Sequence, residues 1–266
     1  MEKITSFKNP KIKNIINLHK ANERKKQNLF VIEGYKEIKA ALRNKVEIDS
    51  TFYCSEIASD SHLTELLRLG LDVQNVFEIT KEIFERIAYR DNSDGLVVLA
   101  TPRYLKLDDI VLCDNPIILV LESVEKPGNL GAILRTADAV NVDAVIVCDT
   151  KTDLFNPNTI RASIGCIFSK QVVVADSKST FNWLQKKGIH VYSTFLNTNN
   201  CYFDMDYTTP TAIVLGTEST GLSQFWQTAS ESLIKIPMLG LVDSLNVSIA
   251  GAVVVFEILR QRQARV

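Results

Sequence analysis

The chain of 266 residues lacks the features of an exported, membrane-spanning or metal-binding protein. No apolar run approaches the roughly 20 residues that a transmembrane helix needs, and Met1-Glu2-Lys3-Ile4-Thr5 has no apolar signal-peptide core. The five cysteines are scattered, odd in number and never spaced as CxxC, and the three histidines are isolated. Because zinc sites and disulfide frameworks need clustered ligands or paired cysteines, we predict no metal, no membrane contact and a cytoplasmic location with reduced thiols.

The glycine fingerprints of nucleotide-binding enzymes are also missing. Gly128-Asn129-Leu130-Gly131 has the wrong spacing for a GxGxxG dinucleotide site, and no glycine-rich loop ends in the lysine of a P-loop. A nucleotide-binding α/β enzyme unrelated to RNA therefore stays an alternative that no motif supports.

The net charge of −1 does not favour a nucleic-acid protein, but the charge is unevenly distributed. Residues 1–45 hold twelve Lys and Arg against four Asp and Glu, whereas residues 46–100 hold four against eleven. Such asymmetry is typical of a basic face that meets phosphate, and a solvated helix face explains it equally well. The candidate RNA-backbone contacts are Lys8, Lys11, Lys13, Lys20, Arg24, Lys25 and Lys26.

Strands and helices alternate over residues 1–100, which predicts a small α/β domain. The expected strands are 29–32, 51–54, 72–76 and 96–100. The expected helices are 11–20, 35–44, 61–69 and 80–89, and residues 21–28 are predicted to be a polar connector. Thr101-Pro102 interrupts this pattern, so residues 101–115 are predicted to form a linker.

Continuous apolar strands recur from residue 116 onward, a pattern typical of a parallel sheet covered on both faces. The expected strands are 117–121, 144–148, 171–174, 190–195, 212–215 and 233–236. The expected helices are 129–140, 156–164, 180–187, 221–229 and 244–261. We therefore predict an α/β protein with a small N-terminal α/β domain and a C-terminal parallel-sheet domain.

Three polar, glycine-containing turns follow strands and lead into helices in the C-terminal half. They are Pro127-Gly128-Asn129-Leu130-Gly131-Ala132-Ile133-Leu134-Arg135-Thr136-Ala137-Asp138, Gly216-Thr217-Glu218-Ser219-Thr220-Gly221, and Ile236-Pro237-Met238-Leu239-Gly240 followed by Ser244-Leu245-Asn246-Val247-Ser248. Backbone N–H groups and hydroxyls at a helix N-terminus form a hydrogen-bonding site, although the same residues also serve as ordinary helix caps.

These three runs, in this order and at this spacing, resemble motifs 1, 2 and 3 of the SpoU/TrmH family of RNA ribose 2′-O-methyltransferases, which belong to the knotted SPOUT class. Phe30-Val31-Ile32-Glu33-Gly34 looks like the ribosomal-protein-like substrate domain that many members carry. The resemblance implies an RNA substrate-binding domain over 1–100, a linker over 101–115, and an S-adenosylmethionine-dependent methyltransferase domain with a trefoil knot over 116–266.

The resemblance also implies roles for individual residues. Arg135 corresponds to the catalytic arginine at the ribose 2′-hydroxyl. Since an arginine pKa above roughly 12 makes deprotonation costly, we expect it to position the hydroxyl and stabilise the developing oxyanion. The other members of the expected catalytic group are Asn129, Glu218, Ser244 and Asn246. The expected S-adenosylmethionine contacts are Thr194, Leu215, Gly216, Ile236, Met238 and Leu245.

The sequence thus indicates an RNA ribose 2′-O-methyltransferase that uses S-adenosylmethionine, acts on rRNA and works as a homodimer, with no DNA partner. A tRNA 2′-O-methyltransferase and a non-catalytic RNA-binding protein of the same fold remain alternatives. Altered residues at 129, 135 or 246 would favour the non-catalytic protein, and all three positions match the family.

Overall fold

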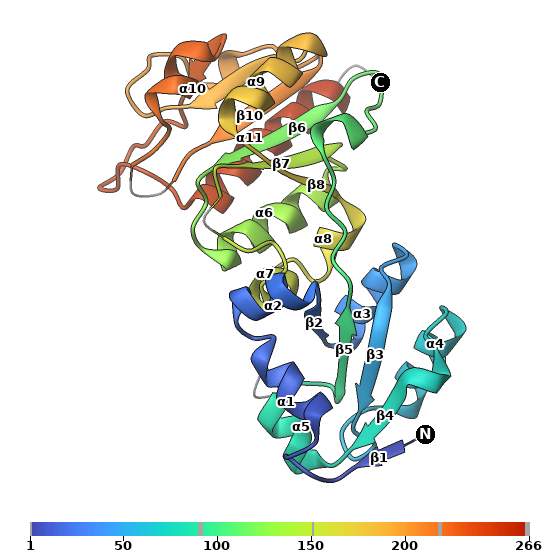
Figure 1. Ribbon diagram of the computed structural model, residues 1–266. Coiled ribbons are helices and arrows are strands. Elements are labelled where there is room, and N and C mark those ends of the chain that lie inside the picture. The colour runs from blue at the N-terminus through green and yellow to red at the C-terminus, as the bar shows by residue number, and fades with distance from the viewer. Residues whose placement is uncertain (1, 90–92, 151, 218–219, 264–266) are drawn as a thin grey trace. The chain divides into compact units, whose positions relative to one another are not determined.

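The computed structural model describes residues 2–89, 93–150, 152–217 and 220–263, and its elements are labelled in Figure 1. The chain forms two compact units. The N-terminal unit comprises Met1–Arg103 and Asp153–Ser169, and the C-terminal unit comprises Tyr104–Thr152 and Lys170–Val266. Each unit contains one sheet packed against helices, as the alternating sequence pattern predicts.

The N-terminal unit contains a mixed sheet in the order β1-β4-β3-β5-β2. Its strands are β1 (Glu2–Ile4), β2 (Phe30–Glu33), β3 (Ile48–Tyr53), β4 (Val76–Ile79) and β5 (Leu96–Ala100). β4 pairs in parallel with β1 and β3, whereas β5 runs antiparallel to β2 and β3. All five residues of β5 are buried, because the strand lies inside the sheet with helices on either side.

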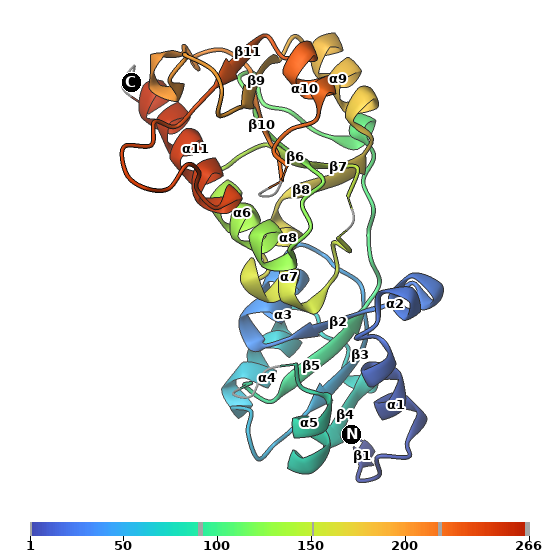
Figure 2. The same cartoon turned by 90° about the vertical axis from the view of Figure 1, so that its left-hand side faces the viewer.

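Helices cover both faces of this sheet (Figure 2). They are α1 (Pro10–Asn17), α2 (Ala21–Gln27), α3 (Tyr35–Arg43), α4 (Asp60–Arg68), α5 (Lys81–Ile87), α7 (Pro157–Ala162) and α8 (Cys166–Ser169), with a 3-10 turn at Val73–Asn75. On one face, Ile12 and Ile15 of α1 pack with Ile83 of α5 over Val97 and Leu99. On the other face, α3 and α7 contact β2.

The segment Asp153–Ser169 lies within the N-terminal unit, although the sequence pattern places it between two strands of the C-terminal sheet. The ring of Phe155 packs against that of Phe30 at 4.5 Å between centroids. Gly165 has φ 79°, and a Cβ at this position would lie 2.7 Å from the Cβ of Ala40. The segment is therefore closely packed on β2 and α3 and adds two helices to the N-terminal core.

The C-terminal unit contains the predicted parallel sheet, in the order β11-β9-β10-β6-β7-β8. Its strands are β6 (Ile117–Glu122), β7 (Ala144–Cys148), β8 (Gln171–Ala175), β9 (His190–Thr194), β10 (Thr211–Leu215) and β11 (Ser232–Ile234). All the pairings are parallel, and β6 and β10 are buried along their whole length. These central strands are continuous apolar runs because helices cover both of their faces.

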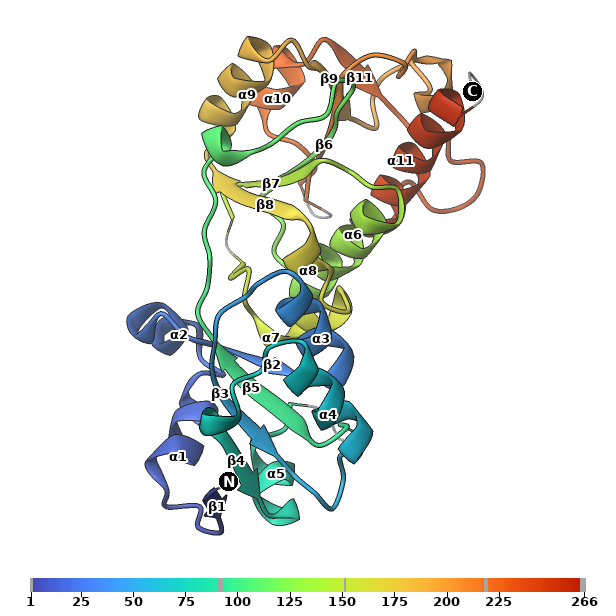
Figure 3. The same ribbon diagram turned by 90° about the vertical axis from the view of Figure 1, so that its right-hand side faces the viewer.

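Two sets of helices cover the C-terminal sheet. They are α6 (Pro127–Ala139) and α11 (Val247–Gln263) on one face, and α9 (Ser177–Lys186) and α10 (Gln224–Ala229) on the other, with 3-10 turns at Leu107–Asp109 and Tyr202–Asp204. Figure 3 shows α11 alongside α6. Among the described residues, no helix has the length and apolar character to cross a bilayer.

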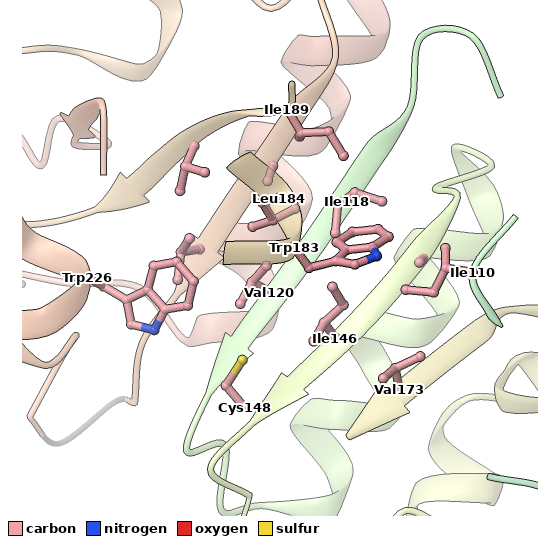
Figure 4. Close-up of a cluster of buried hydrophobic side chains, with 14 of the residues drawn as sticks. Ile110, Ile118, Val120, Ile146, Cys148, Val173, Trp183, Leu184, Ile189 and Trp226 are labelled. Atoms are coloured by element: carbon pink, nitrogen blue, oxygen red, sulfur yellow. The ribbon is translucent and has the colours of Figure 1, made fainter. Parts of the chain in front are cut away.

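The core beneath α9 and α10 is dominated by two tryptophans. Trp183 of α9 and Trp226 of α10 are buried over side chains of β6 and β7, including Val120 and Ile146 (Figure 4). The segment expected to be a linker contributes Ile110 to the same cluster, and Leu105 forms a parallel bridge with Val173. This part of the chain is therefore packed onto the C-terminal core.

Two local predictions were wrong, and one strand was not expected. The strand expected at 72–76 is β4 at Val76–Ile79, because the side chain of Asp72 accepts from Gln74 N and Val73–Asn75 forms a 3-10 turn. Residues 21–28 were expected to form a polar connector, but Ala21–Gln27 is helix α2. Its sequence has no apolar stripe, and it is anchored by the buried side chain of Arg24 instead. Strand β1 was not expected, because three residues next to the terminus give no periodicity, yet Ile4 pairs with Ile79 and is buried.

Candidate functional site

A cavity of about 480 Å³ lies in the C-terminal unit at the carboxyl ends of β9, β10 and β11. Thr194, Leu215 and Ile234 end these three strands and line it. The rest of its wall comes from three loops, at residues 195–197, at 216, 217 and 220–222, and at 235–245, and from the first turn of α11. In parallel α/β sheets, ligands bind outside the carboxyl ends of the strands.

The structure brings all six expected cofactor contacts into the wall of this cavity. They are Thr194, Leu215, Gly216, Ile236, Met238 and Leu245. Leu215 is 1% exposed and also belongs to the core, whereas the other five are half-buried and open toward the cavity. Four of the six side chains are apolar, so the cavity offers a mainly apolar slot with backbone polar groups at its edges.

The two described sides of the loop between β10 and α10 are in contact. Thr217 and Gly221 exchange two backbone hydrogen bonds, at 3.2 and 3.1 Å between N and O. A Cβ at Gly216 would lie 2.4 Å from the carbonyl carbon of Gly221 and 2.5 Å from the nitrogen of Leu222. Only glycine fits at this position. Glu218, expected in the catalytic group, lies outside the described residues.

Asn246 and Asn129, two of the expected catalytic residues, are in contact. Nδ2 of Asn246 donates to Oδ1 of Asn129 at 3.2 Å. Oδ1 of Asn246 accepts from the backbone N of Ser248 at 3.0 Å and from its hydroxyl at 2.6 Å, which caps α11. Ser244 lines the cavity two residues earlier, and its hydroxyl donates to Asp243 at 3.0 Å. The third motif is therefore both a helix cap and part of the cavity wall.

Arg135 is exposed on α6, among the buried residues Ile133, Leu134 and Ala137. It is not one of the residues that line the cavity. The structure thus joins Asn129 of the first motif to Asn246 of the third, while Arg135, also on α6, presents its side chain to solvent. An arginine held on a rigid helix and open to solvent can bind an incoming phosphate or hydroxyl.

The basic residues of the N-terminal unit fall into two groups. Six expected RNA contacts are exposed, namely Lys8, Lys11, Lys13, Lys20, Lys25 and Lys26. Arg24 is only 4% exposed, and its Nε lies 2.6 Å from Oδ2 of Asp153 while Nη1 donates to the carbonyl of Leu18 at 2.7 Å. We therefore withdraw Arg24 from the candidate RNA contacts, because its guanidinium is used inside the protein.

The sequence interpretation missed several polar residues around the cavity. Thr217, Thr220, Lys235 and Asp243 also line it. Glu122 was missed as well: it is 6% exposed at the end of β6 and accepts a hydrogen bond from the backbone N of Ser223 at 2.7 Å. A signal existed for Glu122, because it is a charged residue directly after the five apolar residues 117–121. Within the described ranges, no three His, Cys, Asp or Glu side chains are grouped to hold a metal ion.

Two family models match the chain, one in each half. The model of the SpoU rRNA methylase family matches residues 116–256, and that of the MRM3-like substrate binding domain matches residues 9–98. The C-terminal match contains the cavity, Asn129, Arg135 and Asn246. The N-terminal match contains the exposed lysines from Lys11 to Lys26.

Individual relatives extend this similarity over most of the chain. The 23S rRNA (guanosine-2′-O-)-methyltransferase RlmB of Vibrio cholerae is 37% identical over 76% of this chain and 83% of its own length. The 23S rRNA (guanosine(2553)-2′-O)-methyltransferase RlmP of Bacillus subtilis is 27% identical over 97% of this chain and 99% of its own. The crystal structure of an AdoMet-bound rRNA methyltransferase from Sinorhizobium meliloti has a TM-score of 0.88 and 30% identity, and covers 97% of both chains.

Proposed function

Because the chain belongs to the SpoU rRNA methylase family, we propose that it transfers a methyl group from S-adenosylmethionine to a ribose 2′-hydroxyl of rRNA. The observation that carries the proposal is the cavity at the carboxyl ends of β9, β10 and β11, whose wall contains all six expected cofactor contacts. The Sinorhizobium meliloti structure holds AdoMet, and the Vibrio and Bacillus relatives are named for 2′-O-methylation of 23S rRNA.

The residues of the cavity fit S-adenosylmethionine. Its volume of about 480 Å³ lies within the usual range of small-molecule sites. Ile236, Met238 and Leu245 suit an adenine ring, and the described backbone of the loop between β10 and α10 suits its polar edge. When bound, S-adenosylmethionine supplies an activated methyl group on its sulfonium sulfur.

Arg135 holds the ribose 2′-hydroxyl and an adjacent phosphate of the RNA in the proposed mechanism. Its fork of N–H donors can reach both groups, and its positive charge stabilises the negative charge that develops on the attacking oxygen. The guanidinium does not take the proton of the hydroxyl, since deprotonating an arginine is costly, and the proton passes to an RNA phosphate or to water. Asn129 and Asn246, joined at 3.2 Å, position the ribose, and Ser244 contributes a hydroxyl at the cavity wall.

The exposed lysines of α1, α2 and the preceding loop bind the RNA backbone in this proposal. They are Lys8, Lys11, Lys13, Lys20, Lys25 and Lys26, which lie within nineteen residues of one another on the N-terminal unit. Phosphate contacts of this kind supply affinity and orientation without reading the base sequence. The choice of nucleotide then depends on RNA shape.

The proposed working form is a homodimer in the cytoplasm. Its support is an exposed apolar surface on the C-terminal unit: Ile249 and Phe256 are seven residues apart on α11 and are 53% and 51% exposed. Leu239, Leu241 and Val242, in the loop that precedes α11, are also exposed. A second copy is the partner that would cover such residues. All five cysteines are free, which agrees with a reducing compartment.

Methyl transfer from labelled S-adenosylmethionine to RNA tests the proposal. The RNA comes from a strain that lacks this protein, both as free rRNA and as ribosomal subunits, and the enzyme is compared with its Arg135→Ala variant. We expect label in 23S rRNA at a single alkali-resistant dinucleotide with the wild type and none with the variant. Absence of label from both rRNA and subunits, or label in tRNA alone, would contradict the rRNA assignment.

A further inference from the structure

Glu122 is a buried carboxylate that binds the residue directly after the loop between β10 and α10. It is the last residue of β6, follows five buried apolar residues and is 6% exposed. It is not part of the cavity wall. Burying a carboxylate is costly unless hydrogen bonds compensate it. Oε2 of Glu122 accepts from the backbone N of Ser223 at 2.7 Å, a distance typical of a charge-assisted bond.

Ser223 directly follows the loop that connects β10 to α10. Gly216 follows the last residue of β10, Thr217 and Gly221 exchange backbone hydrogen bonds, and Leu222, which is 3% exposed, belongs to the core. The next residue, Ser223, is the N-cap of α10, and its side chain makes no capping hydrogen bond. The bond to Glu122 therefore ties the end of the loop to β6, the strand that pairs with β10.

From this geometry we propose that Glu122 is a positioning residue for S-adenosylmethionine: it holds Thr217, Thr220 and Gly221 in the positions in which they line the cavity. The inference rests on the proposed function, since it assigns the cavity to that cofactor. The loop is pinned at its start by β10 and at its end by Glu122. Removing the second attachment frees Thr217, Thr220 and Gly221, which line the cavity, to adopt other conformations.

Two variants remove this bond from opposite sides. Glu122→Leu removes the acceptor and leaves a side chain suited to burial. Ser223→Pro removes the donor, and the φ of −60° at Ser223 already matches that of proline. Glu122→Gln retains an amide oxygen that can accept the same bond. If this bond holds the loop, Glu122→Leu and Ser223→Pro lower the affinity for S-adenosylmethionine equally. The double variant then has the same affinity as either single variant.

Asp143 provides a matched control. Its carboxylate also accepts backbone hydrogen bonds, from Ile117 N at 2.8 Å and Cys113 N at 3.1 Å, but at the amino end of β6. Asp143→Ala therefore removes comparable bonds at the other end of the same strand. We expect it to lower the melting temperature without changing cofactor affinity.

Calorimetric titration with S-adenosylmethionine and hydrogen exchange of residues 216–223 test the inference on the whole chain. We expect Glu122→Leu and Ser223→Pro to raise the Kd about 10-fold, the effect of losing one hydrogen bond to a charged group, with Glu122→Gln within about threefold of wild type. The KM for the cofactor should rise while kcat at saturating cofactor is kept. Loop amides should exchange faster in the two disruptive variants and not in Asp143→Ala.

Three outcomes would overturn the inference. The first is wild-type affinity in both Glu122→Leu and Ser223→Pro. The second is an equal loss of affinity in Asp143→Ala, which would show a general effect of stability. The third is unchanged loop exchange in Glu122→Leu, a readout that needs no ligand. If the wild-type protein does not bind S-adenosylmethionine, the proposed function fails, while the exchange measurement still decides whether Glu122 orders the loop.

Discussion

Asn246 donates from Nδ2 to Oδ1 of Asn129 at 3.2 Å, so the start of α11 is joined to the start of α6 across 117 residues of sequence. The amide oxygen of the same side chain, Oδ1, caps α11 by accepting hydrogen bonds from the backbone N and the hydroxyl of Ser248. One side chain therefore has two separable roles, a helix cap and a bridge between two motifs.

The two roles of Asn246 predict different effects for two substitutions. Asn246→Asp keeps the capping oxygen and removes the donor to Asn129, so we expect a melting temperature close to wild type and reduced methyl transfer. Asn246→Ala removes both and should also cost about 1 kcal/mol of stability. Thermal unfolding and methyl transfer by the same preparations check this. Full activity of Asn246→Asp would show that the amide bridge is dispensable.

Arg135 predicts a loss of rate without a loss of fold or of cofactor binding. Its side chain is exposed and does not line the cavity, so Arg135→Ala should change stability by less than about 0.5 kcal/mol and leave the Kd for S-adenosylmethionine unchanged. We expect kcat to fall roughly 10²-fold or more, as when an oxyanion donor is removed. Weakened cofactor binding in this variant would contradict the assignment of Arg135 to the RNA side.

Gly216 predicts a steric effect on the cavity. In Gly216→Ala the new Cβ would lie within 2.4 to 2.6 Å of backbone atoms of Gly221 and Leu222, so the loop has to open and cofactor affinity should fall at least about 10-fold. Gly240→Ala is the control, since it lies in the loop at 235–245 and its Cβ meets nothing within 4 Å. Titration of both variants with S-adenosylmethionine separates them, and equal affinities would refute the steric argument.

We expect substitution of Arg24 to lower stability, and substitution of its lysine neighbours to weaken RNA binding. Arg24→Ala leaves Asp153 without its buried partner and should cost about 2 kcal/mol of stability, less than a fully buried pair because Asp153 is 26% exposed. Lys25→Ala and Lys26→Ala should leave stability unchanged and weaken RNA binding, with a salt dependence shallower by about 0.7 per lysine. Salt titrations of RNA affinity beside thermal unfolding measure both. A reduced salt dependence in Arg24→Ala, at wild-type stability, would restore Arg24 to the RNA contacts.

The buried thiol of Cys148 should make the protein less stable at alkaline pH. Burial in the core raises the pKa of this thiol from 9.0 to about 12, so the folded protein holds its proton at pH values where the unfolded chain has lost it. The stability from this group is complete below about pH 9 and is lost as the pH rises toward 12. Cys148→Ala should make the decline in stability between pH 8 and 10.5 shallower. Chemical denaturation at several pH values measures this decline. If it is as steep in Cys148→Ala as in the wild type, the thiol does not contribute.

Much of the fold could be predicted from local pattern. The six C-terminal strands are found within two residues of their expected bounds, because a fully buried strand is a continuous apolar run whatever its neighbours are. Helix α2 could not be predicted in this way. Its seven residues include no apolar stripe, and the partner that buries Arg24 is Asp153, 129 positions away.

The candidate site could also be predicted only in part from the sequence. Motif resemblance named six residues for the cofactor, and they line one cavity, but their role in binding S-adenosylmethionine stays a prediction until it is measured. The trefoil knot implied by the resemblance also stays a prediction. Glu122 was missed because a terminal charge on a strand is usually solvated; only the position of Ser223, 101 residues later, gives it a use.

The sequence by itself determined the order of the C-terminal strands, their parallel sheet and the three polar turns, because each depends on residues close together in the chain. Tertiary structure decided which charges are buried, which unit Asp153–Ser169 belongs to, and how strand ends and loops enclose one cavity. These outcomes depend on partners about a hundred positions apart. The cost of burying a charge such as Arg24 or Glu122 is met only when the folded chain brings the partner within hydrogen-bonding distance.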